Sequence, residues 1–359
     1  MKGLILSGGA GTRLRPITHT NAKQLVPIAN KPILFYGIEG LAKSGITEIG
    51  IIIGETGDEV REAVGDGSRW GVKVTYIPQH EPLGLAHCVR IARDFLAEED
   101  FVMYLGDNML QQSLSQLVEN FRADRINSSL KCRILLKRVS DPSAFGVAIV
   151  NEQGQVVELI EKPEEPPSDL ALVGVYFFSS SIHQAVASIE PSVRGEYEIT
   201  DAIQGLIEQG IEVDFEELQG WWIDTGKKDP LLECNRLVLA TIVKKIHASS
   251  SVDSTSQLRG KIQIGENSTV SDSVIEGPVV LGDNVIVKGC KIGPNVSIGD
   301  HCSLVSSAID NSVLLKGCVV VQAGCLSSSL LGRSSKVSGT SANSTSSLML
   351  GDDSIVEFR

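Results

Sequence analysis

The sequence has no long apolar run and no histidine cluster. No window reaches the roughly 18 apolar residues that a membrane-spanning helix needs. The apolar stretch at Met1–Leu6 is broken at once by Ser7-Gly8-Gly9, so we expect neither a membrane span nor a secretory signal. The six histidines show no metal-ligand spacing. These absences predict a cytoplasmic protein that uses no histidine-based metal site.

Paired cysteines are missing as well. The chain has seven cysteines, an odd number, and none forms a C-x-x-C pair. Scattered, unpaired cysteines are typical of reduced thiols that are buried as small hydrophobic side chains in a cytosolic protein.

Acidic side chains outnumber basic ones, and the formal net charge is −12. A negative field over the whole molecule disfavours nucleic-acid and anionic-membrane partners. A small anionic substrate remains possible where local cations and a metal ion receive it. No Ser-His-Asp or Cys-His arrangement indicates nucleophilic catalysis.

What is present begins with an alternation of strands and helices over about 220 of the 359 residues. This alternation predicts a mostly parallel sheet with helices on both faces, and a length of 359 residues favours two domains. Strands that follow one another more closely predict an added antiparallel portion of the sheet. A helix over 229–246 is expected to end this N-terminal part of the chain. The expected strands are 3–6, 48–53, 72–77, 101–105, 133–137, 146–150, 156–161 and 173–178, and the expected earlier helices are 33–43 and 86–96.

The pattern changes after the polar stretch ASSSVDSTSQ at 248–257, which is predicted to be a linker. Beyond it, aliphatic residues recur about every six positions, as in Ile292, Ile298 and Leu304. This period is typical of a parallel β-helix, with an antiparallel β-sandwich as the alternative. The predicted divisions are 1–247, 248–257 and 258–359. The serine-rich stretch 334–347 is expected to be an irregular final coil or a loose tail.

Two sequence features suit phosphate and metal binding. The turn from Leu6 to Arg13 has three glycines in four positions, so its N–H groups can point at phosphate oxygens. It matches neither a Walker A loop nor a dinucleotide fingerprint, and a merely structural tight turn stays open. Lys23, ten residues after Arg13, adds a second cation. Asp107 follows the apolar strand 101–105, where an open α/β sheet binds ligands, and Asp224 is a second carboxylate that could bind Mg²⁺.

Seven motifs in order resemble the glucose-1-phosphate thymidylyltransferases, in the long form with an added C-terminal domain. The resemblance implies a Rossmann-like α/β nucleotidyltransferase domain with a mixed sheet, followed by a left-handed parallel β-helix. The motifs are L-S-G-G-A-G-T-R-L-R-P, K-Q-L-V-P-I-A-N-K-P-I, P-L-G-L-A, Y-L-G-D-N, I-E-K-P, R-G-E-Y-E-I-T-D and W-W-I-D-T-G.

The resemblance also implies a role for each matching position. Arg13 and Lys23 would oppose charge at the α-phosphorus, and Asp107 and Asp224 would bind Mg²⁺. The remaining nucleotide contacts would be Gly8, Gly9, Gly11, Thr12, Gln24, Gln79 and Gly84. The sugar-phosphate contacts would be Asn108, Gly146, Glu161, Lys162, Val173-Gly174 and Arg194. Phe145 stands where short-form relatives often have Tyr, so a polar contact is in doubt there.

The implied reaction joins dTTP and glucose 1-phosphate with release of pyrophosphate, by Mg²⁺-dependent in-line displacement. UTP or another nucleoside triphosphate remains an alternative, because a methyl-sized difference discriminates by only about 1–3 kcal/mol. A second alternative is an additional C-terminal acetyltransferase activity. We expect the C-terminal domain to build a homo-oligomer, with a trimer favoured, and to be unnecessary for the chemistry because all motifs precede residue 230.

Overall fold

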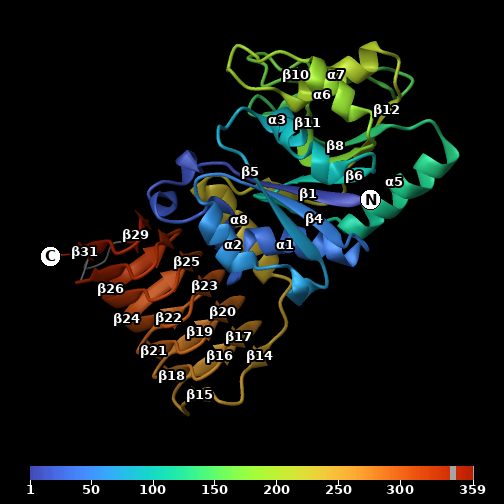
Figure 1. Ribbon diagram of the computed structural model, residues 1–359. Coiled ribbons are helices and arrows are strands. Elements are labelled where there is room, and N and C mark those ends of the chain that lie inside the picture. The colour runs from blue at the N-terminus through green and yellow to red at the C-terminus, as the bar shows by residue number, and fades with distance from the viewer. Residues whose placement is uncertain (340–344, 359) are drawn as a thin grey trace. The chain divides into compact units, whose positions relative to one another are not determined.

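Strand β1 (Lys2–Ser7) lies inside a nine-stranded sheet whose continuous path is β10-β9-β11-β6-β1-β4-β5 (Figure 1). It pairs in parallel with β4 (Glu48–Ile53) and β6 (Phe101–Leu105), and β4 pairs in parallel with β5 (Lys73–Pro78). Five of the six β1 residues are buried, as expected for a strand covered on both faces. The predicted parallel portion is therefore confirmed.

The rest of the sheet is largely antiparallel. β11 (Leu170–Phe178) pairs antiparallel with β6 and with β8 (Cys132–Arg138), and β10 (Val156–Glu161) pairs antiparallel with β9 (Gly146–Val150). β12 (Val213–Glu217) runs parallel to β8. The closely spaced strands thus form the expected antiparallel portion, and the sheet is mixed.

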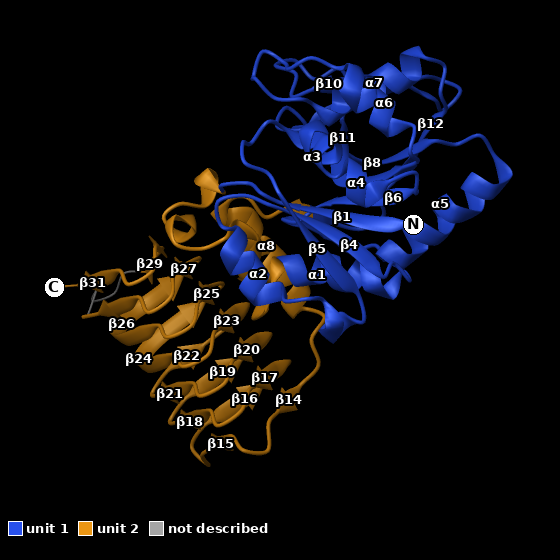
Figure 2. Ribbon diagram, viewed as in Figure 1, with its two compact units in different colours: residues 1–10, 34–222 blue, residues 11–33, 223–359 orange. Residues whose placement is uncertain are grey.

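This sheet belongs to the first of two units in a computed structural model that describes residues 1–339 and 345–358. Unit 1 comprises Met1–Ala10 and Leu34–Trp222, and unit 2 comprises Gly11–Ile33 and Ile223–Arg359 (Figure 2). The grouping differs from the expected division at residue 247, because the segment 11–33 and helix α8 (Lys228–Leu239) cluster with the C-terminal strands. The expected domain boundaries stay a prediction.

Helix α1 has the bounds that its apolar period predicts, Ile33–Lys43, and it buries Leu34, Ile38 and Leu41 completely. The stretch expected as one helix at 86–96 is divided at Ala92 into α3 and α4. Unit 1 also contains the short strand β7 (Asn108–Leu110) and η4 (Ser68–Trp70), and its other helices are α2 (Gly57–Val64), α3 (Leu85–Ile91), α4 (Arg93–Leu96), α5 (Leu114–Asn127), α6 (Ile182–Ser188) and α7 (Ile199–Glu208).

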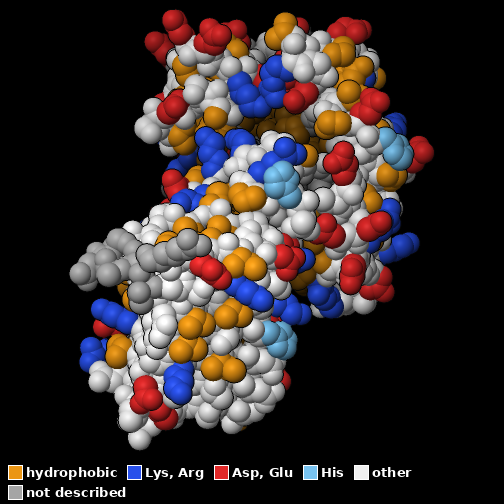
Figure 3. Space-filling model, turned by 90° about the vertical axis from the view of Figure 1, so that its left-hand side faces the viewer, with side chains coloured by type: hydrophobic (Ala, Val, Ile, Leu, Met, Phe, Trp, Pro, Cys, Tyr) orange, Lys and Arg blue, Asp and Glu red, His pale blue; other side chains and the backbone are white. Residues whose placement is uncertain are grey.

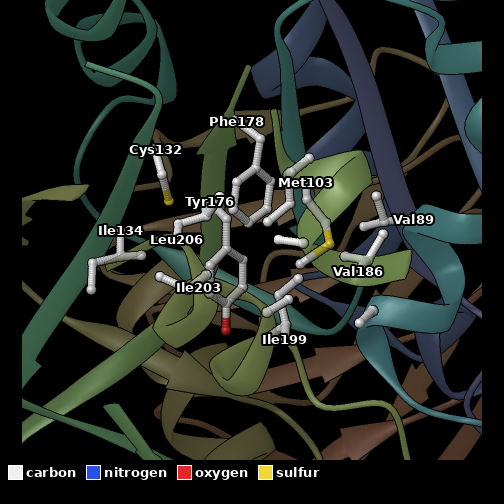
Figure 4. Packing of buried hydrophobic residues seen from close by; sticks show 14 of the residues in the cluster. Val89, Met103, Cys132, Ile134, Tyr176, Phe178, Val186, Ile199, Ile203 and Leu206 are labelled. Atoms are coloured by element: carbon white, nitrogen blue, oxygen red, sulfur yellow. The ribbon is translucent and has the colours of Figure 1, made fainter. Parts of the chain in front are cut away.

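A hydrophobic core joins the sheet of unit 1 to helices α3, α6 and α7. Figure 4 shows Met103 of β6 and Phe178 of β11 beside Val89 of α3 and Val186 of α6. The rings of Tyr176 and Phe178 stack at 5.9 Å between centroids. This packing fixes the strand ends from which the candidate site residues project.

Unit 2 begins with a winding segment that has little regular structure. It holds three 3-10 turns, η1 (Thr12–Leu14), η2 (Ile17–His19) and η3 (Lys23–Leu25), and a small hairpin of β2 (Pro27–Ile28) and β3 (Lys31–Pro32). Asn235 of α8 accepts a hydrogen bond from Ala29 N at 2.8 Å and one from Ser297 Oγ at 2.7 Å. The segment therefore packs with α8 and the C-terminal strands as one unit.

The C-terminal strands are short, parallel and stacked in successive coils. A hydrogen-bonded partner in the next coil lies 17 residues later in many places, as for Ser268 Oγ and Val285 N. Ile292, Ile298 and Leu304 are all completely buried. The strands are β14 (Lys245–Ile246), β15 (Ser251–Val252), β16 (Gln257–Arg259), β17 (Ile262–Ile264), β18 (Thr269–Ser271), β19 (Val274–Glu276), β20 (Val279–Leu281), β21 (Ile286–Lys288), β22 (Lys291–Ile292), β23 (Val296–Ile298), β24 (Ser303–Asp310), β25 (Val313–Leu314), β26 (Val319–Ser327), β27 (Leu330–Leu331), β28 (Lys336–Ser338), β29 (Thr345–Ser346), β30 (Met349–Leu350) and β31 (Ile355–Glu357).

Two expectations about the region between residues 229 and 257 need correction. The helix predicted to reach Ile246 ends at Leu239, because Lys245 and Ile246 pair in parallel with Gln263 and Ile264 as strand β14. The predicted linker is not unstructured, since Ser251 and Val252 of β15 pair with the strand β18. Polar residues fit such short strands because one face of each strand points to solvent.

The serine-rich stretch 334–347 contributes strands β28 and β29, and its residues 340–344 lie outside the described part of the chain. None of the seven cysteines is in a disulfide, and all except Cys325 are buried, as expected. Among the described residues, no helix is long and apolar enough to cross a membrane.

Candidate active site

The glycine-rich turn leaves strand β1 at Gly8 and makes room for neighbouring groups. A Cβ on Gly8 would lie 3.0 Å from Gln79 Oε1, whereas one on Gly9 would meet nothing within 4 Å. Gly11 has a φ of +63°, which favours glycine, and it opens the η1 turn that carries Thr12 and Arg13. The turn therefore exposes backbone at Gly9 and brings Gln79 close to Gly8.

Two cations of unit 2 lie beside one carboxylate. Arg13 Nη2 is 3.4 Å from Asp224 Oδ2, and Lys23 Nζ is 3.8 Å from Asp224 Oδ1. Asp224 Oδ1 also accepts a hydrogen bond from Gly226 N at 2.8 Å. A Cβ on Gly226 would lie within 2.9 Å of both cationic groups, so glycine is needed there for the cluster to close. Three of the four residues predicted as catalytic are thus brought together.

Lys23 and Gln24 are buried although both are polar. The Lys23 side chain is 8% exposed, and Gln24 is 3% exposed, on the η3 turn. Gln24 Oε1 is buried and has no hydrogen-bond partner among the described residues. A buried acceptor without a partner is costly, so a ligand that donates a hydrogen bond would stabilise it.

Gln79 follows strand β5 in unit 1, where its backbone N–H donates to Ile53 O at 2.8 Å. Its side-chain Nε2 lies 3.1 Å from His87 Nδ1. The pKa of His87 is lowered from its ordinary value, mainly because burial disfavours the charged ring. A neutral His87 can accept from Gln79 through Nδ1, which leaves Gln79 Oε1 for other partners.

Gly84 caps the N-terminus of α3 in a conformation that only glycine adopts easily. Its φ is +97°, and an added Cβ would lie 2.5 Å from Tyr197 O. Tyr197 N donates to Leu83 O, and Ala86 N donates to Tyr197 O. The start of α3 is therefore tied to the R-G-E-Y-E-I-T-D stretch, and both motifs belong to one local structure.

Asp107 and Asn108 follow the carboxyl end of β6, as predicted. Asn108 is 3% exposed, donates to Asp107 Oδ1 at 3.0 Å and accepts from Trp222 Nε1 at 2.6 Å. A Cβ on Gly174 would lie 2.7 Å from Asn108 Oδ1, so the backbone of β11 at Gly174 closely approaches the Asn108 side chain. The ring of Phe145 lies 4.9 Å from that of Trp222, so position 145 makes an aromatic contact.

The predicted sugar-phosphate residues of unit 1 gather around Glu161 at the end of β10. Both Arg194 Nη1 and Lys162 Nζ lie 3.3 Å from Glu161 Oε1, while Thr200 Oγ1 donates to Glu161 Oε2 at 3.2 Å. A Cβ on Gly146 would be 3.3 Å from Glu161 Oε2. Val173 is completely buried.

Figure 3 shows Lys and Arg side chains gathered beside a hollow in the upper part of the visible face. Cations at a hollow suit an anionic ligand. Near Glu161, the pKa of Glu198 is raised mainly by burial, while its Oε1 lies 3.3 Å from Arg194 Nη1. The charge of Arg194 is thus shared among several carboxylates.

Among the described residues, no group of three or more His, Cys, Asp or Glu side chains forms a metal site by itself. Asp107 belongs to unit 1 and Asp224 to unit 2. Sequence reasoning missed Trp222, Thr200 and Glu198 as parts of these clusters. Each lies within a recognised motif, but only the structure shows which side chain it contacts.

Comparison with known proteins identifies the family of this chain. The family model for nucleotidyl transferases matches residues 2–241, and the model for the GMPPB C-terminal domain matches residues 275–357. A glucose-1-phosphate thymidylyltransferase of Streptomyces griseus is 49% identical over 99% of this chain and 98% of its own length. One of Streptomyces antibioticus is 48% identical over the full length of both chains. A solved structure from Bacillus anthracis, assigned as a glucose-1-phosphate thymidylyltransferase in complex with a sucrose, is 35% identical. It has a TM-score of 0.61 and covers 66% of this chain and 94% of that one.

Proposed function

Because this chain belongs to the nucleotidyl transferase family, we propose that it transfers the thymidylyl group of dTTP to glucose 1-phosphate. The products are dTDP-glucose and pyrophosphate. The full-length similarity to two thymidylyltransferases supports the substrates. In the structure, the observation that carries the proposal is the cluster of Arg13 and Lys23 at Asp224, which suits the charge of a triphosphate.

The reaction needs no covalent intermediate on the protein. A phosphate oxygen of glucose 1-phosphate attacks the α-phosphorus of dTTP, the bond to the β-phosphate oxygen breaks, and pyrophosphate leaves. Arg13 and Lys23 stabilise the negative charge that grows on the transferred phosphoryl group. Asp224 orients the two cations, and backbone N–H groups of Gly8, Gly9 and Gly11 contact the other phosphates.

The proposed base contacts are Gln24, Gln79 and the backbone at Gly84. The buried Gln24 Oε1 would accept a hydrogen bond from N3–H of thymine. Uracil has the same N3–H, so UTP is the alternative substrate, whereas cytosine presents an acceptor at N3. The discrimination between dTTP and UTP then rests on a methyl group and a hydroxyl group, and we expect it to be partial.

On the sugar side, we propose that Lys162 and Arg194 bind the phosphate of glucose 1-phosphate. Glu161 would accept hydrogen bonds from the sugar hydroxyls, beside Asn108, Gly146 and the backbone of Val173 and Gly174. The Glu161 carboxylate already lies 3.3 Å from each cation, which holds the cations in place before the substrate arrives. Such preorganisation reduces the cost of aligning the nucleophile.

Mg²⁺ is the cofactor that we propose, with Asp107 and Asp224 as its protein ligands. Carboxylate oxygens are the donors that this ion prefers, and one or two of them suffice when substrate phosphates complete the coordination. The contacts of Asp224 with its cations are long, at 3.4 and 3.8 Å, so a bound metal ion would replace only weak contacts. When bound, the ion neutralises phosphate charge.

One assay tests the proposal. Pyrophosphate release is measured for four nucleoside triphosphates, each against glucose, galactose, mannose and N-acetylglucosamine 1-phosphates, with Mg²⁺ or with EDTA. We expect the highest kcat/KM for dTTP with glucose 1-phosphate, and no turnover in EDTA. The absence of turnover with both dTTP and UTP would falsify the proposed function.

We further propose that the C-terminal strands form a left-handed parallel β-helix with a hexapeptide period, which assembles the chain into a homo-oligomer, with a trimer favoured. The parallel ladders and the 17-residue spacing between coils support the β-helix. Exposed Ile286 and Ile355 on this domain offer apolar surface for assembly. Light scattering at micromolar concentration tests it, and a monomer would contradict it. The substrates and the unpaired thiols favour the cytoplasm.

A further inference from the structure

One carboxylate in the last coils of the C-terminal strands reaches the segment that carries Arg13 and Lys23. Asp352 lies in the turn between β30 and β31, and its Oδ2 accepts hydrogen bonds from Thr20 Oγ1 and Asn21 Nδ2, both at 2.9 Å. All of these residues belong to unit 2. The contact spans more than 300 residues of sequence and ends two positions before Lys23.

The other oxygen of Asp352 has an ordinary structural task. Its Oδ1 accepts from Arg333 N at 2.7 Å. Two earlier turns use the same device, since Asp283 Oδ1 accepts from Glu266 N at 2.6 Å and Asp300 Oδ1 accepts from Asp283 N at 2.8 Å. Among the described residues, the contact of the second oxygen with the segment 11–33 distinguishes Asp352 from Asp283.

Asn21 connects Asp352 to the segment that carries Arg13 and Lys23. It is 3% exposed, and its Nδ2 also donates to Ile17 O at 3.0 Å, so the amide bridges Asp352 and the preceding turn. The backbone then enters η3, where Lys23 points its Nζ at Asp224. A hydrogen bond from Thr18 Oγ1 to Gly11 O at 2.7 Å closes the loop on its other side.

A second contact with the C-terminal strands is made by the chain that follows Asp224 in the sequence. Lys228, which opens α8, donates from Nζ to Ser328 O and to Ser347 Oγ, both at 3.1 Å. Those serines lie in the same final coils as Asp352. The segments before Lys23 and after Asp224 are therefore both fastened to the end of the C-terminal domain.

We propose that Asp352 is a positioning residue for the proposed transfer reaction: it fixes the 11–25 loop so that Arg13 and Lys23 face the triphosphate. The inference rests on the proposed function for its effect on turnover. It gives the last coils of the C-terminal domain a part in the active site, and it changes our expectation that this domain is unnecessary for the chemistry.

Asp352→Asn separates the two tasks of the side chain. The amide oxygen still accepts from Arg333 N, but the amide NH₂ now faces two donors, Thr20 Oγ1 and Asn21 Nδ2. Asp283→Asn is the matched control, because it changes the same kind of turn without a partner in the 11–33 segment among the described residues. Both variants should melt within a few degrees of the wild type, as for most changes near a surface.

The experiment compares steady-state kinetics and amide hydrogen exchange of the full-length wild type and both variants. For Asp352→Asn we expect kcat/KM for dTTP to fall about tenfold, as for loss of a charge-assisted contact. The KM for glucose 1-phosphate should stay within about twofold. Exchange at residues 11–25 should become faster without any substrate, whereas Asp283→Asn should match the wild type in both measurements.

Thr20→Val tests the same contact from the other side and covers the case in which Asp352→Asn folds poorly. Its effect and that of Asp352→Asn should be less than additive in the double variant, because both remove one interaction. Asp352→Asn kinetics and exchange equal to those of Asp283→Asn would overturn the proposal. If the wild type turns over neither dTTP nor UTP, the proposed function fails, and exchange at residues 11–25 still decides the positioning role.

Discussion

Arg13 and Lys23 contact the same carboxylate, but their side chains differ in exposure to solvent. The Arg13 side chain is 53% exposed and that of Lys23 is 8% exposed. An exposed guanidinium contributes little to stability through its ion pair, so its value lies in the charge that it presents to the substrate. We therefore expect Lys23 to be preorganised and Arg13 to settle when the nucleotide binds.

The first prediction follows from that difference. Arg13→Ala should lower kcat for dTTP by about 10²-fold or more, the scale for losing one preorganised electrostatic contact, with an almost unchanged melting temperature. Arg138→Ala is the control, because Arg138 makes a 2.7 Å exposed ion pair with Asp169 outside the site. If both variants keep wild-type kcat, Arg13 has no part in the reaction.

The second prediction concerns the two carboxylates. Asp107→Asn and Asp224→Asn should each lower kcat by about 10²-fold or more and weaken the response to Mg²⁺, because an amide is a poorer ligand for this ion. Titration of activity with MgCl₂ measures both effects. A variant whose activity stays within about threefold of the wild type excludes that residue from the metal site.

His87 leads to the third prediction, because its pKa is lowered by burial. Arg90 lowers it further, and Glu81 opposes the shift. The folded protein therefore holds this proton less tightly than the unfolded chain, so folding stability is complete above the ordinary histidine pKa of about 6.5 and falls in more acid solution. Protonation also turns Nδ1 into a donor, which conflicts with Gln79 Nε2.

We thus expect the KM for dTTP to rise as the pH falls below the ordinary histidine pKa of about 6.5. His87→Leu cannot be protonated, so its KM should be higher at neutral pH but flat over this range. Steady-state kinetics of both proteins from neutral to mildly acid pH measures the effect. Parallel pH profiles for the two proteins would rule out His87 as the titrating group.

At the scale of elements, the start of helix α3 combines positive φ with a close backbone approach. Gly84→Ala should lower the melting temperature and raise the KM for dTTP, because the new Cβ would lie 2.5 Å from Tyr197 O at a φ of +97°. Gly154→Ala is the control, since Gly154 has a φ of +76° with nothing within 4 Å. Thermal melting of both variants separates the clash from backbone strain. An equal fall in melting temperature for the two variants would show that the contact with Tyr197 is unimportant.

The elements also show what the sequence could predict. Helix α1 has its predicted bounds because Leu34, Ile38 and Leu41 form a clear apolar stripe on one face. The expected end of α8 at Ile246 was wrong, because aliphatic residues suit a strand as well as a helix and the decision came from pairing with Gln263 and Ile264. Local pattern gives the type of an element, while long-range pairing sets its limits.

The same holds for the candidate site. Motifs identified Arg13, Lys23 and Asp224 because phosphate chemistry requires such residues, and the structure brings them together. The contact of Asp352 with Thr20 and Asn21 could not be predicted, since an aspartate in a turn of a repeating domain looks like any other. Only three-dimensional placement distinguishes it from Asp283.

At the scale of the whole molecule, the grouping of residues 11–33 with the C-terminal strands bears on truncation. Removing residues 250–359 deletes Asp352, Ser297 and Ser328, which contact Asn21, Asn235 and Lys228 in the remaining chain. It also leaves Asn30 Nδ2 without the carbonyl of Ile298. Each lost hydrogen bond costs the remaining chain about 0.5–1.5 kcal/mol of stability, because water replaces the missing partner.

The last prediction is therefore that a chain ending at Ser249 loses far more than its assembly. We expect its melting temperature to fall and its kcat/KM for dTTP to drop by more than about tenfold, because the loop that carries Arg13 and Lys23 is no longer held. Circular dichroism, light scattering and the pyrophosphate assay on both chains measure fold, assembly and turnover separately. A folded, soluble truncated chain with wild-type kcat/KM would restrict the C-terminal domain to assembly. Loss of turnover with an intact fold would instead assign its last coils to the active site.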